Sequence, residues 1–276
     1  MRLSQEQIDR YHDLGFLLIE SAFDAAELRE LRDAFLRDRE VPGEHRVMED
    51  GGQAVRAVYA SHLRQPSYAA LVRSPQLLEP THQLLGTEVH VYQLKVNAKP
   101  QFAGAGWAWH QDYMAWKIAD ALPAPRLLNV AVFLDDITEF NGPIIVLPGT
   151  HRLGLVQGGA ATSGSGQHLD PDEIAITPDQ MVSLAAEHGM QSVKGPAGSV
   201  AFFSPEIVHG SAQNVSPMAR VIAIVTYNDV ANQSPVGWDR RPEYLVGRDP
   251  RPLEVGSGVI TSHAREELLP ARSARS

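Results

Sequence analysis

Two imidazoles and one carboxylate form the set of side chains in this 276-residue sequence that is best suited to metal chemistry. His110 and Asp112 lie two positions apart in a strand-like run, and side-chain alternation in a strand would place both on one face. His209, in a second short β-like segment, can supply the third ligand. This ligand set is typical of non-haem Fe(II) oxygenases, where the remaining positions stay open for a co-substrate and dioxygen. The sequence therefore predicts a metal centre at these three residues.

A second pair with the same spacing, His168 and Asp170, competes for this assignment. It follows a segment rich in Gly, Ser and Ala and precedes Pro171, where no strand is expected to hold the two side chains in register. We therefore interpret it as a decoy. The chain has eleven histidines and no cysteine, so thiolate chemistry, iron–sulfur clusters and disulfides are excluded. Any metal must be bound by nitrogen and oxygen atoms.

Arg220 opens an otherwise apolar run, and a guanidinium in such a place needs a buried anion. The turn-rich stretch between His209 and Arg220 predicts a hairpin that brings Arg220 beside His209 and Ser211. 2-Oxoglutarate would supply the anion, because its ketoacid end chelates iron and its far carboxylate would pair with Arg220 and Ser211. The alternative is a structural ion pair of Arg220 with Asp135 or Asp136.

The elements that must position these residues change in character at Glu88, where short β-rich runs separated by Gly, Pro and Asn begin. This spacing is typical of a β-sandwich or barrel, so we predict a mainly β fold with flanking helices. The predicted strands cover 16–19, 89–96, 107–113, 127–134, 144–147, 199–203 and 220–227. The predicted helices begin after capping boxes at Ser4 and Asp24, at Pro75, and over 178–187.

The net charge and the hydropathy of the chain limit the kinds of partner that the protein is expected to bind. The chain has 24 Lys and Arg against 33 Asp and Glu, a net charge of −9, which repels phosphate backbones and anionic lipid surfaces. We therefore expect neither nucleic acid nor a membrane as a partner, and nothing in the sequence indicates an obligatory protein partner. The apolar stretch at 15–19 is too short for a signal-peptide core or a membrane span, so we expect a cytoplasmic protein.

The chain resembles the phytanoyl-CoA dioxygenase superfamily, and within it is most similar to ectoine hydroxylase and bacterial hydroxylases of free amino acids of the leucine type. The matching motifs are 93–116, 141–143, 147–151, His209–Ser211 with Arg220, and, less specifically, 59–62, 226–230 and 241–244. These motifs span most of the chain. The resemblance implies a double-stranded β-helix (jelly roll, cupin-like) that uses Fe(II), 2-oxoglutarate and O2.

Carried over position by position, the resemblance implies a role for individual residues. They are the iron ligands His110, Asp112 and His209, the 2-oxoglutarate contacts Arg220, Ser211, Asn97 and Trp107, and the substrate contacts Gln93, Trp116 and Phe203. Trp107 stands at an odd offset from His110, so both can face the site only if the strand contains a bulge or a twist. Ile222 and Ile224 replace polar and aromatic pocket residues of ectoine hydroxylase, and Tyr113 replaces a small hydroxyl residue, which favours an aliphatic substrate over ectoine.

In domain terms, we expect a single Fe(II)/2-oxoglutarate dioxygenase domain over 1–276. It would comprise a helical N-terminal support (1–87), a β-helix core (88–230) and an irregular C-terminal tail on the surface (231–276). The Gly- and Ser-rich segment 158–166 is a candidate lid, because lids need low local stability.

The expected activity is hydroxylation of an unactivated C–H bond in a small free amino acid, aliphatic and with L-leucine as the first candidate, giving succinate and CO2. One alternative substrate is a carrier- or CoA-linked acyl group or another secondary metabolite, for which the arginines after Val230 would offer a docking patch. A non-enzymatic ligand-binding jelly roll is the other alternative, although binding alone does not require the metal set together with Arg220. Halogenation is disfavoured, because it needs a small residue in place of Asp112.

Overall fold

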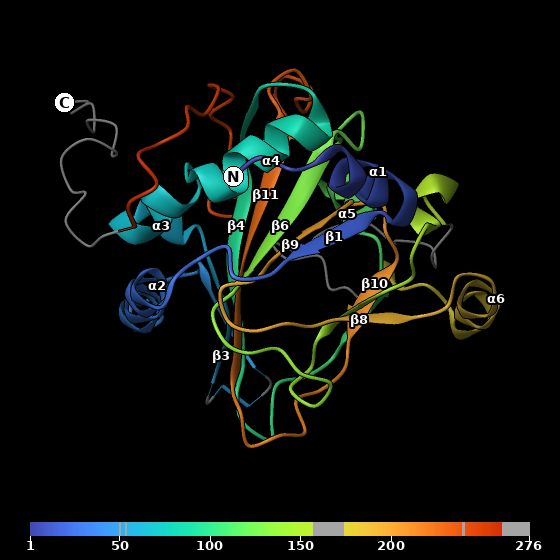
Figure 1. The fold of residues 1–276 in the computed structure, drawn as a ribbon, viewed down its shortest axis with the longest axis horizontal. Helices are drawn as coiled ribbons and strands as arrows, with labels where there is room; N and C mark the ends of the chain where they lie inside the picture. Colours follow the sequence, from blue (N-terminus) through green and yellow to red (C-terminus); the bar gives the residue numbers. More distant parts are fainter. Residues whose placement is uncertain (50, 53, 157–173, 239–240, 261–276) are drawn as a thin grey trace.

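The computed structural model describes residues 1–276 except 50, 53, 157–173, 239–240 and 261–276. Its strands form two antiparallel sheets that pack against each other, and helices cover the outer face of the larger sheet (Figure 1). This is the arrangement of a double-stranded β-helix with flanking helices. The predicted mainly β fold class is therefore confirmed.

In the described part of the chain, seven strands form the larger sheet and four form the smaller one. The larger sheet contains β1 (Phe16–Ile19), β2 (Arg46–Met48), β3 (Val55–Tyr59), β4 (Val89–Lys99), β6 (Leu127–Phe133), β9 (Val200–Phe203) and β11 (Arg220–Asp229). The smaller sheet contains β5 (Trp107–His110), β7 (Ile144–Val146), β8 (Gln191–Val193) and β10 (His209–Ser211). The strand orders are β1-β9-β6-β11-β4-β3-β2 and β5-β10-β7-β8, so β4, β6 and β11 lie at the centre of the larger sheet.

Capping patterns in the sequence locate most of the helices correctly. The helices are α1 (Gln5–Leu14), α2 (Ala25–Asp38), α3 (Pro66–Leu71), α4 (Pro75–Leu85), α5 (Asp112–Ala119) and α6 (Pro178–His188), with 3-10 turns η1 (Ser61–Leu63) and η2 (Thr150–Leu153). Both capping boxes form, with Ser4 accepting from Gln7 N and Asp24 accepting from Glu27 N. Helices α3 and α5 were not predicted, because six and eight residues are too few to show a helical period.

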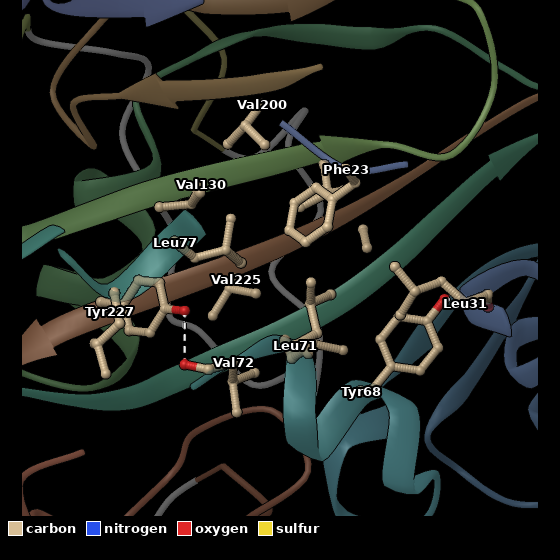
Figure 2. Packing of buried hydrophobic residues seen from close by; sticks show 14 of the residues in the cluster. Phe23, Leu31, Tyr68, Leu71, Val72, Leu77, Val130, Val200, Val225 and Tyr227 are labelled. Carbon is tan, nitrogen blue, oxygen red and sulfur yellow. Dashed lines mark hydrogen bonds between the residues drawn. The ribbon is translucent and has the colours of Figure 1, made fainter. Parts of the chain in front are cut away.

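The main apolar core lies between the larger sheet and helices α1–α4. Alternation along β11 places Ala223, Val225 and Tyr227 on this outer face. Figure 2 shows Val225 and Tyr227 among apolar side chains of the neighbouring strands and helices, with the Tyr227 hydroxyl donating to the carbonyl of Val72 at 2.9 Å. The helices therefore hold the sheet from outside and leave its other face free to carry the site.

The inner face of the larger sheet, which faces the smaller sheet, carries an unusual number of polar side chains. Cross-strand neighbours on this face of β4 and β11 are Gln93–Thr226, Lys95–Ile224, Asn97–Ile222 and Lys99–Arg220. Registered partners point to the same face of a sheet, so these side chains form successive rows. The rows extend toward the strands of the smaller sheet that carry the predicted histidines.

Two local predictions are wrong. The run 107–113 is not one strand, since β5 ends at His110 and Asp112 is the first residue of α5. The predicted hairpin between His209 and Arg220 does not form either, because β10 and β11 belong to different sheets. Arg220 instead approaches Ser211 across the space between the sheets, where both line the same pocket.

The described residues of the C-terminal tail, 231–238 and 241–260, contain neither helix nor strand. The tail is not only a surface segment, however. Residues 241–247, which we call the strap, pack over β4, and Leu245 is 1% exposed. The strap is held by backbone donation from Gly247 to Tyr92 at 2.6 Å and by the Gln93 side-chain amide donating to the Leu245 carbonyl at 2.8 Å. Part of the tail therefore packs against the sheet and contributes buried residues to the interior of the protein.

Candidate active site

The three predicted metal ligands converge at one buried point between the sheets. His110 ends β5, His209 begins β10 beside it, and Asp112 comes from the first turn of α5. Their ligand atoms all lie within 4.8 Å of one another. The Asp112 carboxylate lies between the two rings, with Oδ1 3.5 Å from His110 Nε2 and Oδ2 3.6 Å from His209 Nε2.

Backbone carbonyls orient both histidine rings toward this point. Nδ1 of His110 lies 2.7 Å from the carbonyl of Ala108, and Nδ1 of His209 lies 3.0 Å from the carbonyl of Ile207. A carbonyl oxygen only accepts, so each Nδ1 carries a proton and each Nε2 faces the common point. The donor set of two imidazoles and one carboxylate therefore fits a divalent metal such as Fe(II).

The local electrostatics favour the protonation states that a metal requires. Burial, together with the neighbouring His110, lowers the pKa of His209 to about 4, so this imidazole is neutral at pH 7. Burial by itself would raise the pKa of Asp112, but the Lys95 ammonium and the two neighbouring histidines outweigh it and hold that pKa well below the ordinary carboxyl value. An ionised Asp112 and a neutral His209 are the forms in which these two side chains bind a metal.

Helix geometry, not strand alternation, brings Asp112 to the site. The carboxylate lies in the first turn of α5, where the helix dipole favours negative charge. The preceding residue, Gln111, pins the turn: its amide donates to the carbonyls of Gly154 and Glu206, and its oxygen accepts from Val156 N. Trp116, four residues after Asp112, lies on the same helical face and lines the same pocket.

A β-bulge in β5 explains how Trp107 reaches the site. His110 pairs with His209, and Trp107 pairs with Ser211, so three steps along β5 oppose two steps along β10. The extra residue shifts the alternation, and both Trp107 and His110 line the pocket. Arg56 stacks over the Trp107 ring at 4.1 Å from its centroid. Of the bulge and the twist that could bring Trp107 to this face, the structure contains the bulge.

Arg220 is a buried cation with no counter-ion among the described residues. Its side chain is 2% exposed, and its Nε has no hydrogen-bond partner. The structural ion pair considered for it is absent, since Asp135 accepts from Val221 N at 2.8 Å and pairs with Arg32. A buried guanidinium with unused donors, lining the pocket beside Ser211, is the arrangement that binds a carboxylate of a small molecule.

Lys99 is a residue of this end of the site that the sequence reasoning missed. Its Nζ donates to Ser211 Oγ at 2.8 Å and to the carbonyl of Ala212, and it lies opposite Arg220 in the register of β4 and β11. Since Lys99 donates to the Ser211 oxygen, the hydroxyl proton of Ser211 is free to bind an anion. Alternation from Asn97 along the same strand was the signal that would have identified it.

The protonation of Lys99 leads to a pH-dependent affinity. Burial, with a contribution from Arg220, lowers the pKa of Lys99 to about 7. An anion binds better when this ammonium is charged, so the affinity for 2-oxoglutarate should fall as pH rises above 7, by up to about tenfold per pH unit. Calorimetric titration from about pH 6 to about pH 9 measures this. In Lys99→Met the affinity should be lower and nearly independent of pH, and an unchanged slope would contradict the assignment.

Every predicted site residue lines one pocket, including Asn97, Gln93 and Phe203. Phe203 also packs edge-on against His209, with ring centroids 5.4 Å apart. The pocket has further lining residues that were not predicted, namely Tyr59, Lys95, Ala115, Ile144, Ile174, Gly210, Arg241 and Leu245. Of the two isoleucines expected at the substrate, Ile224 lines the pocket, whereas Ile222 is not among its lining residues and packs in the core between the sheets.

The decoy pair His168 and Asp170 and the candidate lid 158–166 lie outside the residues that the structure describes. No helix in the described part of the chain is long and apolar enough to cross a membrane.

Asp120 connects α5 to the strap and is expected to be critical for stability. It follows the end of α5, is 4% exposed, and accepts from Arg241 Nε at 2.7 Å and from the Tyr92 hydroxyl. Asp120→Asn should leave Arg241 without its counter-ion and cost about 3–5 kcal/mol of unfolding free energy. Thermal denaturation measures the loss. The matched variant Asp249→Asn, which breaks an exposed pair with Arg251, should stay within about 0.5 kcal/mol, and equal effects would contradict this role for Asp120.

Two facing sheets around a buried set of two histidines and one carboxylate define the class of protein. It is a jelly-roll protein with a metal centre of the kind found in non-haem Fe(II) oxygenases. The family model for phytanoyl-CoA dioxygenase (PhyH) matches residues 11–222. The chain belongs to the phytanoyl-CoA dioxygenase family, which confirms the resemblance seen in the sequence.

The chain is also similar to individual proteins within and near this family. The chain is 37% identical over 255 residues to an L-proline trans-4-hydroxylase of Streptomyces griseoviridis, covering 88% of this chain and 92% of that one. It is 34% identical over 265 residues to an ectoine dioxygenase of Bordetella bronchiseptica, covering 91% and 86%. The crystal structure of EctD from S. alaskensis with 2-oxoglutarate and 5-hydroxyectoine superposes with a TM-score of 0.81 at 27% identity, covering 92% and 87%.

Proposed function

We propose that this protein hydroxylates an unactivated C–H bond of a small free amino acid with an aliphatic side chain. It is a 2-oxoglutarate-dependent dioxygenase of the hydroxylase type, and its cofactors are Fe(II), 2-oxoglutarate and O2. The observation that carries the proposal is the convergence in one pocket of the metal ligand set, the unpaired Arg220 and an apolar wall.

His110, Asp112 and His209 would hold the iron. When bound, Fe(II) with 2-oxoglutarate activates dioxygen, so that one oxygen atom enters the C–H bond of the substrate and the other leaves in succinate beside CO2. The protein's residues would bind and orient the substrate and the cosubstrate, and they would exclude water from the site. Arg220 and Ser211 would bind the far carboxylate of 2-oxoglutarate, with Asn97 and Trp107 lining the same part of the pocket.

The opposite part of the pocket has the chemistry of an amino-acid site. Lys95 lines it from the inner face of β4 and forms no ion pair with the described residues, so it can bind the substrate carboxylate. Trp116, Phe203 and Ile224 supply apolar walls for an aliphatic side chain. Gln93 would contact the substrate through its oxygen, because its amide nitrogen already donates to Leu245 in the strap.

L-Leucine and L-proline are the two candidate substrates. The aliphatic wall at Ile224 supports leucine, and the relative named as an L-proline trans-4-hydroxylase supports proline. We also propose that the whole chain acts as one domain, because Tyr59 from the N-terminal part and Leu245 from the tail both line the pocket. A cytoplasmic location and the lack of an obligatory protein partner stay predictions from the sequence.

The deciding experiment measures succinate formation from 2-oxoglutarate with Fe(II) in air, with L-leucine, L-proline, ectoine and an acyl-CoA as separate substrates. Stimulation by leucine or proline, with a product heavier by one oxygen atom, supports the proposal. Stimulation by the acyl-CoA alone, or by no free amino acid, overturns the substrate class. Lys95→Met should raise the KM for the amino acid while leaving the KM for 2-oxoglutarate nearly unchanged.

A further inference from the structure

One polar side chain interrupts the most deeply buried strand of the larger sheet. Every residue of β6 is buried, and Asn129 is the only one in its sequence LLNVAVF that is not apolar. Asn129 is fully buried, at 0% exposure. Burying a carboxamide in an apolar strand is costly unless its groups are hydrogen-bonded, so the partners of Asn129 show what it is doing there.

The two partners of Asn129 determine which way its amide points. Thr226, its registered neighbour on β11 and also 0% exposed, donates from Oγ1 to Asn129 Oδ1 at 2.7 Å. An ionised carboxylate only accepts, so the amide nitrogen must face Asp112, and Asn129 Nδ2 donates to Asp112 Oδ2 at 2.8 Å. The amide oxygen then faces Thr226 and accepts the proton of its hydroxyl. The hydroxyl of Thr226 thus orients an amide that in turn holds the carboxylate of the metal site.

Asn129 and Thr226 belong to a single row of side chains across the sheet. The register places Phe203, Asn129, Thr226 and Gln93 side by side on β9, β6, β11 and β4. Phe203 packs against the ring of His209, and Gln93 anchors the strap. The row therefore lies on the larger-sheet side of the metal site, and Asp112 reaches the row from α5.

We propose that Asn129, oriented by Thr226, is a positioning residue that engages Oδ2 of Asp112 and reserves Oδ1 for the metal. A carboxylate free to rotate can offer both oxygens to one cation and so occupy a position that 2-oxoglutarate or dioxygen needs. A charge-assisted bond from a fixed amide prevents this rotation. This inference rests on the proposed metal centre, and it assigns a task to two residues that contact neither substrate nor cosubstrate.

The test measures binding of Mn(II) to the full-length protein, with and without 2-oxoglutarate, together with the visible charge-transfer absorption of the anaerobic Fe(II)–2-oxoglutarate complex. Thr226→Val keeps the shape of the side chain and removes only the hydroxyl. It should lower Mn(II) affinity by about 10- to 100-fold and weaken or shift the absorption, and Asn129→Leu should do the same. Thr226→Ser restores the hydroxyl and should bring both readouts back to within a few-fold of the wild type.

Thr81→Val is the matched control, because Thr81 is equally buried and its hydroxyl donates to Leu77 within α4. It should leave metal binding unchanged. If folded Thr226→Val binds Mn(II) as the wild type does, or if Thr226→Ser and Thr226→Val behave alike, the positioning role is wrong. If the wild type binds neither Mn(II) nor Fe(II), the proposed function fails together with this inference.

Discussion

Asp112→Ala is expected to abolish substrate-dependent succinate formation and to lower metal affinity by more than the roughly 10- to 100-fold that loss of an outer-shell partner costs. The physical reason is that Asp112 supplies the only negative charge of the ligand set, at a buried site between His110 and His209. Without it, two neutral imidazoles must hold a divalent cation in a low-dielectric environment. Turnover assays and calorimetric metal titration measure the two effects.

The same experiment should give a parallel result for His209→Ala. Matched controls are Asp33→Ala and His12→Ala, which remove an exposed carboxylate and an exposed imidazole far from the pocket and should leave turnover near the wild-type value. The metal-site assignment would be overturned by His209→Ala protein that retains iron binding and turnover. Replacement of the decoy residue His168 by alanine should not affect metal binding, and a loss there would point to the alternative site.

Arg220→Met is expected to change cosubstrate binding and stability in opposite directions. The KM for 2-oxoglutarate should rise about 30-fold or more, because truncating one partner of a buried charge pair costs about 2–5 kcal/mol. The metal-free protein without 2-oxoglutarate should become more stable. Burial lowers the pKa of Arg220 from its ordinary value to about 10, which corresponds to about 3 kcal/mol spent on burying an uncompensated charge at neutral pH.

Thermal denaturation with and without 2-oxoglutarate separates these two effects. The melting temperature of the wild type should rise when 2-oxoglutarate is added. Arg220→Met should have a higher melting temperature than the wild type without 2-oxoglutarate, and the cosubstrate should raise it little. Arg32→Met is the control, because Arg32 pairs with Asp135 and is 44% exposed in its side chain, so it should change neither the KM nor the response to 2-oxoglutarate. A variant at Arg220 that loses stability and keeps its KM would mean that Arg220 is structural.

Much of the fold was readable because its signals are local. Capping boxes at Ser4 and Asp24 start helices by hydrogen bonds within four residues, and the β-rich composition of 220–227 is a property of that segment itself. The errors came where non-local contacts decide. Asp112 was assigned to a strand because the residues before it alternate, but Gln111, held by Gly154, Val156 and Glu206, turns the chain into α5.

The residues predicted for the candidate site line one pocket, but the geometry that brings them together was not predicted. Lys99 and Asn129 were overlooked because a lysine or asparagine in a strand shows no chemical role until its cross-strand neighbours are known. Arg220 was placed beside Ser211 through a hairpin, whereas the two residues meet across the space between two sheets. The strap was expected on the surface because an irregular segment carries no pattern of burial.

By itself, the sequence determined the ligand types, the lack of thiol chemistry, the buried cation at 220 and the mainly β class, because each follows from residue identity or short-range spacing. Only the tertiary structure decided that His110, Asp112 and His209 meet, that Trp107 reaches the pocket through a bulge, and that Thr226 and Asn129 hold Asp112. These contacts depend on strand order and register, which are selected by the packing of the whole sheet and not by neighbours along the chain.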